Sequence, residues 1–351
     1  MIKFAGVLTL AATIFGASGQ EKDPAMPNLV AKKALQWMQN SDPEKRAAAY
    51  RTFQLYGDEG GAIYRRILEK ARDIHTEKLS DLLEDERANP FAGLDQLADE
   101  LNKERTRIYA LIKTDYKKDP AKIAMLNREM ESLAKLYEKA QKLAAKDGTS
   151  LEKSITAVST ALSEVHREIN LVDGEKEKAA GCTPKTALEE SFEGSEYLKT
   201  KATIVRLQKE KTDLEKAHAD NDACSWANAS QKTFTRVLND NRALFALTPL
   251  RLEERLSQAS VDHSRDMATM GFFAHQSPVP GKKTPNDRAK KAGFKHRWTG
   301  ENIFVGSGSP LAAYNAWFGS DGHRFIMFAK GPNLIGIGPH GRHWTMMTGK
   351  K

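Results

Sequence analysis

Two apolar seams with coiled-coil spacing constrain the fold of this chain most strongly. In each seam apolar residues recur at alternating steps of four and three, the pattern of helices that pack along one stripe. The seams consist of Leu126, Met130, Leu133, Tyr137, Ala140 and Ala144, and of Leu151, Ile155, Val158, Leu162, Val165 and Ile169. Asp147-Gly148 interrupts the register, and residues 149–152 have the pattern of a capping box. The spacing predicts an antiparallel helical hairpin over residues 121–172.

Other helical patterns surround this predicted hairpin. A weaker seam runs through residues 187–219, and short helical patterns cover 28–40, 47–56 and 63–74. The seams fit either a bundle within one chain or a stalk that forms a homo-oligomer through the coiled coil. This region shows no catalytic constellation, because His75, His166 and His218 stand alone on charged faces.

The N-terminus has the pattern of an export signal. Met1 to Lys3 is a short positive segment, and Phe4 to Ala17 is apolar and free of charge. Small residues then favour signal-peptide cleavage near Gly19-Gln20, with an uncleaved anchor as the alternative. We expect a secreted or periplasmic protein, in which Cys182 and Cys224 would form a disulfide. Two free thiols are the alternative, since one straight helix over 187–219 would hold the two cysteines apart.

The composition changes near residue 235. Residues 241–351 carry 16 basic and 7 acidic side chains, six of the nine His, 13 of the 24 Gly and 7 of the 13 Pro. These numbers predict a compact mixed domain. The same region holds five ordered motifs, which are H-S-R-D-M-A (263–268), G-F-F-A-H-Q-S-P (271–278), G-E-N-I (300–303), A-W-F-G-S-D-G-H-R (316–324) and H-W-T (343–345).

In this order and at these spacings, the motifs resemble the CAP superfamily. It includes cysteine-rich secretory proteins, insect venom antigens, plant pathogenesis-related proteins and bacterial SCP-like proteins. The resemblance implies an α+β fold whose C-terminal part is an α-β-α sandwich, preceded by an all-α coiled-coil region. It also implies a cleft that holds two His and two acidic residues. Carried over by motif, the cleft residues are His275, Glu301, Asn302, Asp321, His323 and His343. The Gln that follows the Thr in the family is Met346 here.

The chemistry of these residues leaves two arrangements open. His275, His343 and a carboxylate could hold Zn²⁺ with an open position for an activated water, as in a metal-assisted hydrolase with Glu301 or Asp321 as the base. Alternatively, Glu301 could orient His275 in a hydrogen-bonded network that requires no cofactor. We favour the second arrangement, in an exported CAP domain that is presented by a helical stalk and binds a ligand at the cell envelope. A structural envelope protein with a vestigial cleft is a third hypothesis.

A basic stretch precedes Glu301 and bears on the partner. It contains Lys282-Lys283, Lys290-Lys291 and Lys295-His296-Arg297. For an exported chain, an anionic lipid, cell-wall polymer or polysaccharide is a better match than nucleic acid. The segment 336–341 fits G-x-G-x-x-G but lacks a following helix, which excludes a dinucleotide fingerprint.

These observations predict four regions in the chain. They are a signal peptide (1–19), a short helical region (20–115), a coiled-coil hairpin with a third helix (116–230) and a CAP domain (231–351).

Overall fold

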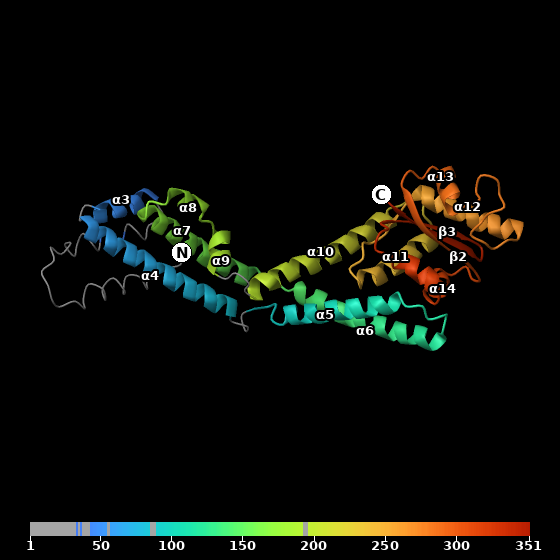
Figure 1. The fold of residues 1–351 in the computed structure, drawn as a ribbon, viewed down its shortest axis with the longest axis horizontal. Helices are drawn as coiled ribbons and strands as arrows, with labels where there is room; N and C mark the ends of the chain where they lie inside the picture. Colours follow the sequence, from blue (N-terminus) through green and yellow to red (C-terminus); the bar gives the residue numbers. More distant parts are fainter. Residues whose placement is uncertain (1–32, 34–35, 37–42, 55–56, 85–88, 192–195) are drawn as a thin grey trace. The chain divides into compact units, whose positions relative to one another are not determined.

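The computed structural model describes residues 33, 36, 43–54, 57–84, 89–191 and 196–351 (Figure 1). The predicted signal peptide and the helical pattern at 28–40 lie outside this description, apart from residues 33 and 36. The chain divides into unit 1, residues 1–92 and 147–198, and unit 2, residues 93–146 and 199–351. Within the described ranges, no helix has an apolar stretch long enough for a membrane span.

Unit 1 is a small helical body. Its helices are α3 (Pro43–Gln54), α4 (Gly57–Glu84), α7 (Thr149–Val172), α8 (Lys176–Gly181) and α9 (Pro184–Ser191). Along one side of α7, Val165 and Ile169 pack against Tyr64 and Ile67 of α4. Further along the same helices, Ile155 and Leu162 pack with Leu79. The second predicted seam is therefore buried against α4.

The helical part of unit 2 consists of α5 (Leu94–Ile112), α6 (Pro120–Ala144) and most of α10 (Glu196–Asp222). α5 and α6 pack side by side as a helical hairpin, joined by residues 113–119 (Figure 1). The Asp119 side chain caps α6 by accepting from the backbone of Ala121 and Lys122. Two amides tie α6 to α10: Gln141 donates to the carbonyl of Leu207, and Gln208 donates to that of Ala144.

The predicted pairing of the two seams is wrong. Both seams lie on helices with buried stripes, but α6 packs on α5 and α7 packs on α4, and the two seam helices belong to different units. The reason is that a heptad seam specifies a buried face and not its partner. α5 offers α6 a matching stripe in Leu94, Leu97, Leu101, Ile108 and Ile112. Each seam is therefore buried within the chain, against α5 or α4.

The predicted disulfide is also absent. Cys182 and Cys224 are free thiols, and each donates a long hydrogen bond to a carbonyl in its own helical turn. Cys182 belongs to unit 1 and Cys224 to unit 2. Between them in the chain lies α10, which has 27 residues and a length of about 40 Å.

The C-terminal part of unit 2 is an α-β-α sandwich, as predicted. Its elements are α11 (Ala229–Ala243), β1 (Arg251–Leu252), α12 (Glu254–Met270), α13 (Pro285–Lys291), β2 (Arg297–Val305), α14 (Pro310–Phe318), α15 (Asp321–Met327), β3 (Leu334–His340) and β4 (His343–Lys350). The strand order is β1-β3-β4-β2. β1 is parallel to β3, and the other pairs are antiparallel. β2 is therefore an edge strand.

Helices cover both faces of this sheet. α12 and α13 lie on one face, where Gly336 and Gly338 of β3 let the backbone of α12 approach closely. α11, α14 and α15 lie on the other, where Phe234 packs against Trp317 and Trp344. The alternation of β2 sends Glu301 to the α13 face and Asn302 to the α15 face.

The α5–α6 hairpin is bonded to the sandwich through α15. The fully buried Arg324 donates to the carbonyls of Ile112 and Thr114, with N–O distances of 2.9 and 2.8 Å. The Tyr109 hydroxyl of α5 donates to the carbonyl of Phe328, and Lys113, the residue after α5, donates to that of Phe325. The boundary predicted at 115/116 separates α5 from α6, although both helices form one unit with the sandwich.

Candidate functional site

A buried carboxylate on the edge strand is the centre of the site. The Glu301 side chain is only 2% exposed, and both of its oxygens are bonded. Oε2 accepts from Nη2 of Arg288 at 2.5 Å, and Oε1 lies 2.8 Å from Nδ1 of His275. The guanidinium thus balances the charge of a carboxylate that would otherwise be costly to bury.

Arg288 also fixes the loop that carries His275. It lies on α13, which begins at a capping box formed by Thr284 and Asp287. Its Nη1 donates to the carbonyls of His275 and Lys282, at 3.0 and 3.1 Å. One arginine therefore holds both the carboxylate and the backbone at His275.

α12 holds the other side of the same loop. Nε2 of His263 donates to the carbonyl of Ala274 at 3.1 Å, and Asp266 forms an ion pair with Lys282 at 2.8 Å. Burial, reinforced by the nearby charge of Arg288, lowers the pKa of His263 to about 4. His263 is therefore neutral at physiological pH and serves to position the loop.

These contacts determine which nitrogen His275 presents. An ionised carboxylate only accepts hydrogen bonds, so Nδ1 of His275 is the donor to Glu301. In the neutral ring Nε2 is then an unprotonated acceptor. Because the His275 side chain is 48% exposed, a ligand can reach this ring. A protonated His275 would instead offer Nε2 as a donor.

His323 is the second imidazole of the site. It lies on α15, on the opposite face of β2, and its carbonyl accepts from Nδ2 of Asn302 at 3.0 Å. Burial lowers the pKa of His323, and the charges of His275 and Lys118 lower it further. Nδ1 of His323 and Oδ1 of Asn302 are buried without a hydrogen-bond partner in the described part of the chain. The structure thus brings together His275, Glu301, Asn302 and His323 of the predicted cleft.

Asp321 does not join this group. It begins α15 and bonds Nη2 of Arg324 at 2.6 Å. Burial alone would raise the pKa of Asp321, but hydrogen bonds with the Asp115 side chain and the Tyr116 backbone, together with Arg324, hold it well below its usual range. Its carboxylate thus contacts the α5–α6 loop. Asp321, which was predicted to line the cleft, lies instead where α15 meets that loop.

His343 is also outside the group. It pairs with Val305 across the sheet, whereas Glu301 pairs with Met347, four residues along β4. Four residues of strand correspond to about 13 Å. The pKa of His343 is lowered by burial and then by the charges of His340 and Arg342, which lie at the β3–β4 turn. The predicted ligand pair His275 and His343 is therefore not assembled.

The remaining residues do not fit the predicted zinc. A His₂Glu centre needs a carboxylate oxygen free for the metal, and both oxygens of Glu301 are already bonded. Among the described residues, no group of three or more His, Cys, Asp or Glu is arranged to hold a metal ion.

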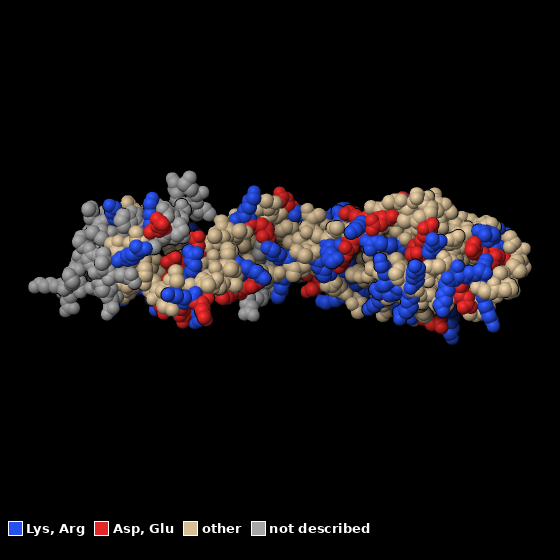
Figure 2. All heavy atoms as spheres, turned by 90° about the horizontal axis from the view of Figure 1, so that it is seen from above, with Lys and Arg blue, Asp and Glu red and all other residues tan. Residues whose placement is uncertain are grey.

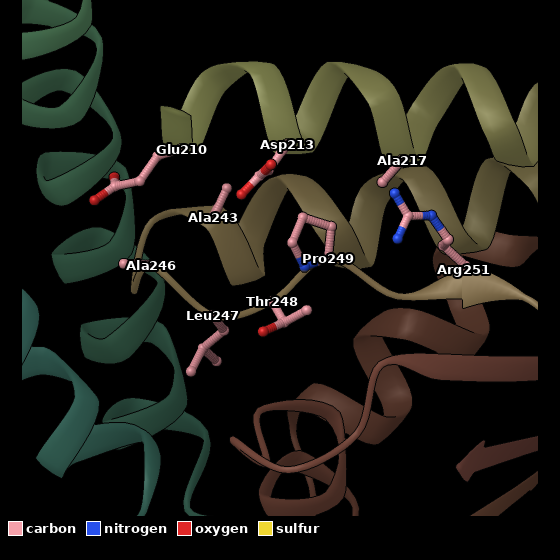
Figure 3. Close-up of a pocket in the computed structure, with 9 residues that line it drawn as sticks. All are labelled: Glu210, Asp213, Ala217, Ala243, Ala246, Leu247, Thr248, Pro249 and Arg251. Atoms are coloured by element: carbon pink, nitrogen blue, oxygen red, sulfur yellow. The ribbon is translucent and has the colours of Figure 1, made fainter. Parts of the chain in front are cut away.

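A separate cavity of about 230 Å³ lies between α10 and the segment 246–251 (Figure 3). Its charged lining is already paired. Glu210 bonds Arg105, Asp213 bonds Lys209, and Arg251 bonds Asp220. We therefore place the candidate site at His275 and His323.

The sequence reasoning missed Arg288, and it did not predict what His263 and Lys118 do. The pattern T-P-N-D at 284–287 would have indicated the short helix that presents Arg288. His263 was noticed beside Asp266, but no pattern showed that both hold the His275 loop. Lys118 lies more than 150 residues before His275 in the sequence, and no local signal connects the two.

Comparison with known proteins agrees with this fold. The model of the cysteine-rich secretory protein (CAP) family matches residues 235–341. The C-terminal third of the chain is therefore a CAP domain, as the motifs indicated.

Two curated relatives match about a third of the chain each. The uncharacterized protein YkwD of Bacillus subtilis is 34% identical over 133 residues, which are 37% of this chain and 51% of the relative. The uncharacterized membrane protein YlbC of the same species is 26% identical over 116 residues, 33% of each chain. The chain thus spans about half the length of the first relative and a third of the second.

Solved structures match a similar share of the chain. An extracellular protein containing an SCP domain from Bacillus anthracis has 25% identity and a TM-score of 0.34, covering 35% of this chain and 41% of its own. An outer surface protein from Borrelia burgdorferi has 17% identity and a TM-score of 0.30, covering 34% and 91%.

Proposed function

We propose that the CAP domain is a ligand-binding module of an exported protein and that its ligand contacts His275 and His323 at the edge of β2. The observation that carries this proposal is the bonding of Glu301. Because Arg288 and His275 occupy both of its oxygens, the carboxylate orients an imidazole and leaves Nε2 for a ligand. A buried, fully bonded support beneath one accessible side chain is the arrangement expected of a binding site.

The same bonding disfavours the metal-assisted hydrolase. A general base must reach the proton that it abstracts, and Glu301 is covered and paired on both oxygens. Asp321 is bonded to Arg324. His343 pairs with Val305, whereas Glu301 pairs with Met347, so His343 lies four residues along β4 from the partner of Glu301. Both predicted bases, Glu301 and Asp321, thus have carboxylates that are already bonded.

The N-terminal pattern and the surface charge suggest where the ligand is found. Residues 1–19 have the pattern of a signal peptide, which supports action outside the cytoplasm. Figure 2 shows Lys and Arg side chains gathered over the part of the molecule that holds the CAP domain. In the sequence, Lys283, Lys290 and Lys295 lie between His275 and Glu301. An anionic lipid, cell-wall polymer or polysaccharide matches this charge.

A thermal-shift measurement on the full chain tests the proposed function. The probes are phosphatidylglycerol vesicles, a glycerol-phosphate polymer, an acidic polysaccharide and Zn²⁺. We expect at least one organic probe to raise the melting temperature of the wild type by several degrees, because a ligand that binds only the folded state stabilises it. The shift should vanish in His275→Ala and persist in His340→Ala, an exposed histidine at the β3–β4 turn.

Two results would contradict the proposal. One is the absence of any shift with the organic probes, which would favour a vestigial cleft. The other is a Zn²⁺ shift that requires both His275 and His343, which would restore the hydrolase.

A further inference from the structure

The loop between α12 and α13 exposes large apolar side chains. Met270, the last residue of α12, is 56% exposed, and Phe273 is 50% exposed. Between them Gly271 ends the helix in a left-handed conformation with φ of 69°, which glycine adopts without strain. The chain therefore turns away from α12 with an apolar side chain on each side of the turn. Apolar side chains that gather on a surface in this way mark an interaction site.

The same loop forms a hollow of about 960 Å³ that is open to solvent. Its lining is mainly apolar and includes Phe272, Ala274, Pro278, Val279 and Pro280. Phe273 lies between two of these residues in the chain, so the exposed side chains and the hollow form one apolar surface. Because the hollow is open, it suits contact with an extended surface better than the enclosure of a small ligand.

Hydrogen bonds hold this loop in one shape. The backbone N–H of Ser277 donates to the carbonyl of Lys283 at 2.9 Å, and that of Lys282 donates to the carbonyl of Val279 at 3.0 Å. The buried Arg288 donates to the carbonyl of Lys282 as well, at 3.1 Å. A loop that is closed in this way presents its apolar side chains without the entropy cost of being ordered by a partner.

Basic side chains border the hollow. Lys283 is exposed and belongs to its lining. The ammonium nitrogen of Lys291, an exposed residue of α13, lies 3.5 Å from the position that a Cβ on Gly281 would occupy, and Gly281 also lines the hollow. Two lysines from different elements therefore stand at the edge of one apolar surface.

Two acidic residues near the loop are already engaged. Residues 271–297 contain seven basic side chains and one acidic side chain, Asp287, whose carboxylate accepts from the backbone of Thr284 at 3.0 Å. Asp266 of α12 forms its ion pair with Lys282 at 2.8 Å. The border of the hollow is thus positively charged, which favours an anionic partner.

We propose that this loop docks the protein on a bilayer that contains anionic lipids. Met270 and Phe273 enter the boundary between headgroups and acyl chains, and Lys283 and Lys291 lie at the headgroups. An apolar face bordered by lysines is the pattern of proteins that lie on a membrane, and each lysine adds attraction to anionic lipid. The proposal goes beyond the proposed function, because it requires no ligand at the imidazole of His275.

Vesicle flotation tests this inference. The sample is residues 20–351, the exported form expected after signal-peptide cleavage, because the apolar segment 4–17 would itself bind lipid. We expect binding to phosphatidylglycerol vesicles at least about tenfold tighter than to phosphatidylcholine vesicles, and weaker binding at high salt. Equal binding to both lipids would contradict the role of the lysines.

Variants of the loop separate its two contributions. Phe273→Ser should weaken vesicle binding at least about tenfold, because a large apolar side chain no longer leaves water. Phe273→Trp should retain the binding, since tryptophan favours the membrane interface. Lys283→Gln and Lys291→Gln should each weaken binding to phosphatidylglycerol about fivefold.

Two controls make the same kinds of change elsewhere. Leu311 is 53% exposed on α14, over the other face of the sheet, and Lys122 is exposed on α6. Leu311→Ser and Lys122→Gln should leave vesicle binding unchanged. A loss in Leu311→Ser as large as that in Phe273→Ser would contradict a specific docking loop.

The outcomes separate this inference from the proposed function. No vesicle binding by the wild type, or binding that Phe273→Ser leaves unchanged, would overturn the docking loop, while the other organic probes would still decide the proposed function. Vesicle binding that persists in His275→Ala but not in Phe273→Ser would support the loop as a separate surface. Light scattering without lipid covers another occupant, because a dimer that is lost in Phe273→Ser would assign the surface to a second copy and contradict the proposal.

Discussion

Gly338→Ala should destabilise the CAP domain by at least about 3 kcal/mol or prevent it from folding. A Cβ at this position would lie 2.1 Å from the backbone of Ser260 and Val261 in α12. Backbone atoms cannot move aside by changing rotamer, so the helix itself would have to shift from the sheet. The measurement is urea unfolding followed by tryptophan fluorescence, which reports mainly on unit 2 because four of the five Trp lie there, at 226, 298, 317 and 344.

Gly331→Ala is the matched control. A Cβ there would meet no atom within 4 Å, so we expect a change within about 0.5 kcal/mol. Gly336→Ala should resemble Gly338→Ala, since its Cβ would lie 2.3 Å from the backbone of Leu256. A Gly338→Ala protein as stable as the wild type would contradict the close packing of α12 on β3.

Glu301→Ala should cost about 3 to 5 kcal/mol of stability. Removal of the carboxylate leaves the guanidinium of Arg288, which is 1% exposed, as an unpaired buried charge. It also frees His275 from its support. The free energy of unfolding can be measured by the same urea titration.

The control for Glu301→Ala is the exposed ion pair of Arg265 and Asp262. Its N–O distance is 3.1 Å, and Arg265→Ala should cost no more than about 0.5 kcal/mol. In the double variant Glu301→Ala with Arg288→Ala, the loss should be smaller than the sum of the two single losses, because no buried charge is left unpaired. A loss below about 1 kcal/mol for Glu301→Ala would show that the pair is not buried as described.

The fold of the CAP domain and half of its site were predictable because both depend on local order. The motifs placed His275 and Glu301 in one cleft, and a hydrogen bond joins the two side chains in the structure. G-I-G at 336–338 was correctly excluded as a nucleotide motif, and its glycines instead let α12 reach the sheet. These features depend on residue types with few alternative roles: a buried carboxylate needs hydrogen-bond donors, and only glycine lets two backbones approach so closely.

The remaining features depend on partners that the sequence does not specify. A heptad seam predicts which face of a helix is buried, but not which helix covers it. In the folded chain α5 covers the seam of α6 and α4 covers the seam of α7, and only the three-dimensional packing shows this. In the segment D-G-H-R, the side chains of Asp321 and Arg324 bond the α5–α6 loop, while His323 lies within electrostatic reach of His275. One short helix therefore serves two purposes, and the motif alone does not distinguish them.

The protonation of the His275 ring tests the central claim most directly. A ¹⁵N–¹H spectrum of the imidazoles, recorded at about pH 8 where histidine is neutral, identifies the protonated nitrogen in each ring. If Glu301 orients His275 for a ligand, Nδ1 of His275 carries the proton and Nε2 is bare. A His275 ring that carries its proton on Nε2 would contradict the Glu301 hydrogen bond and, with it, the binding site that we propose.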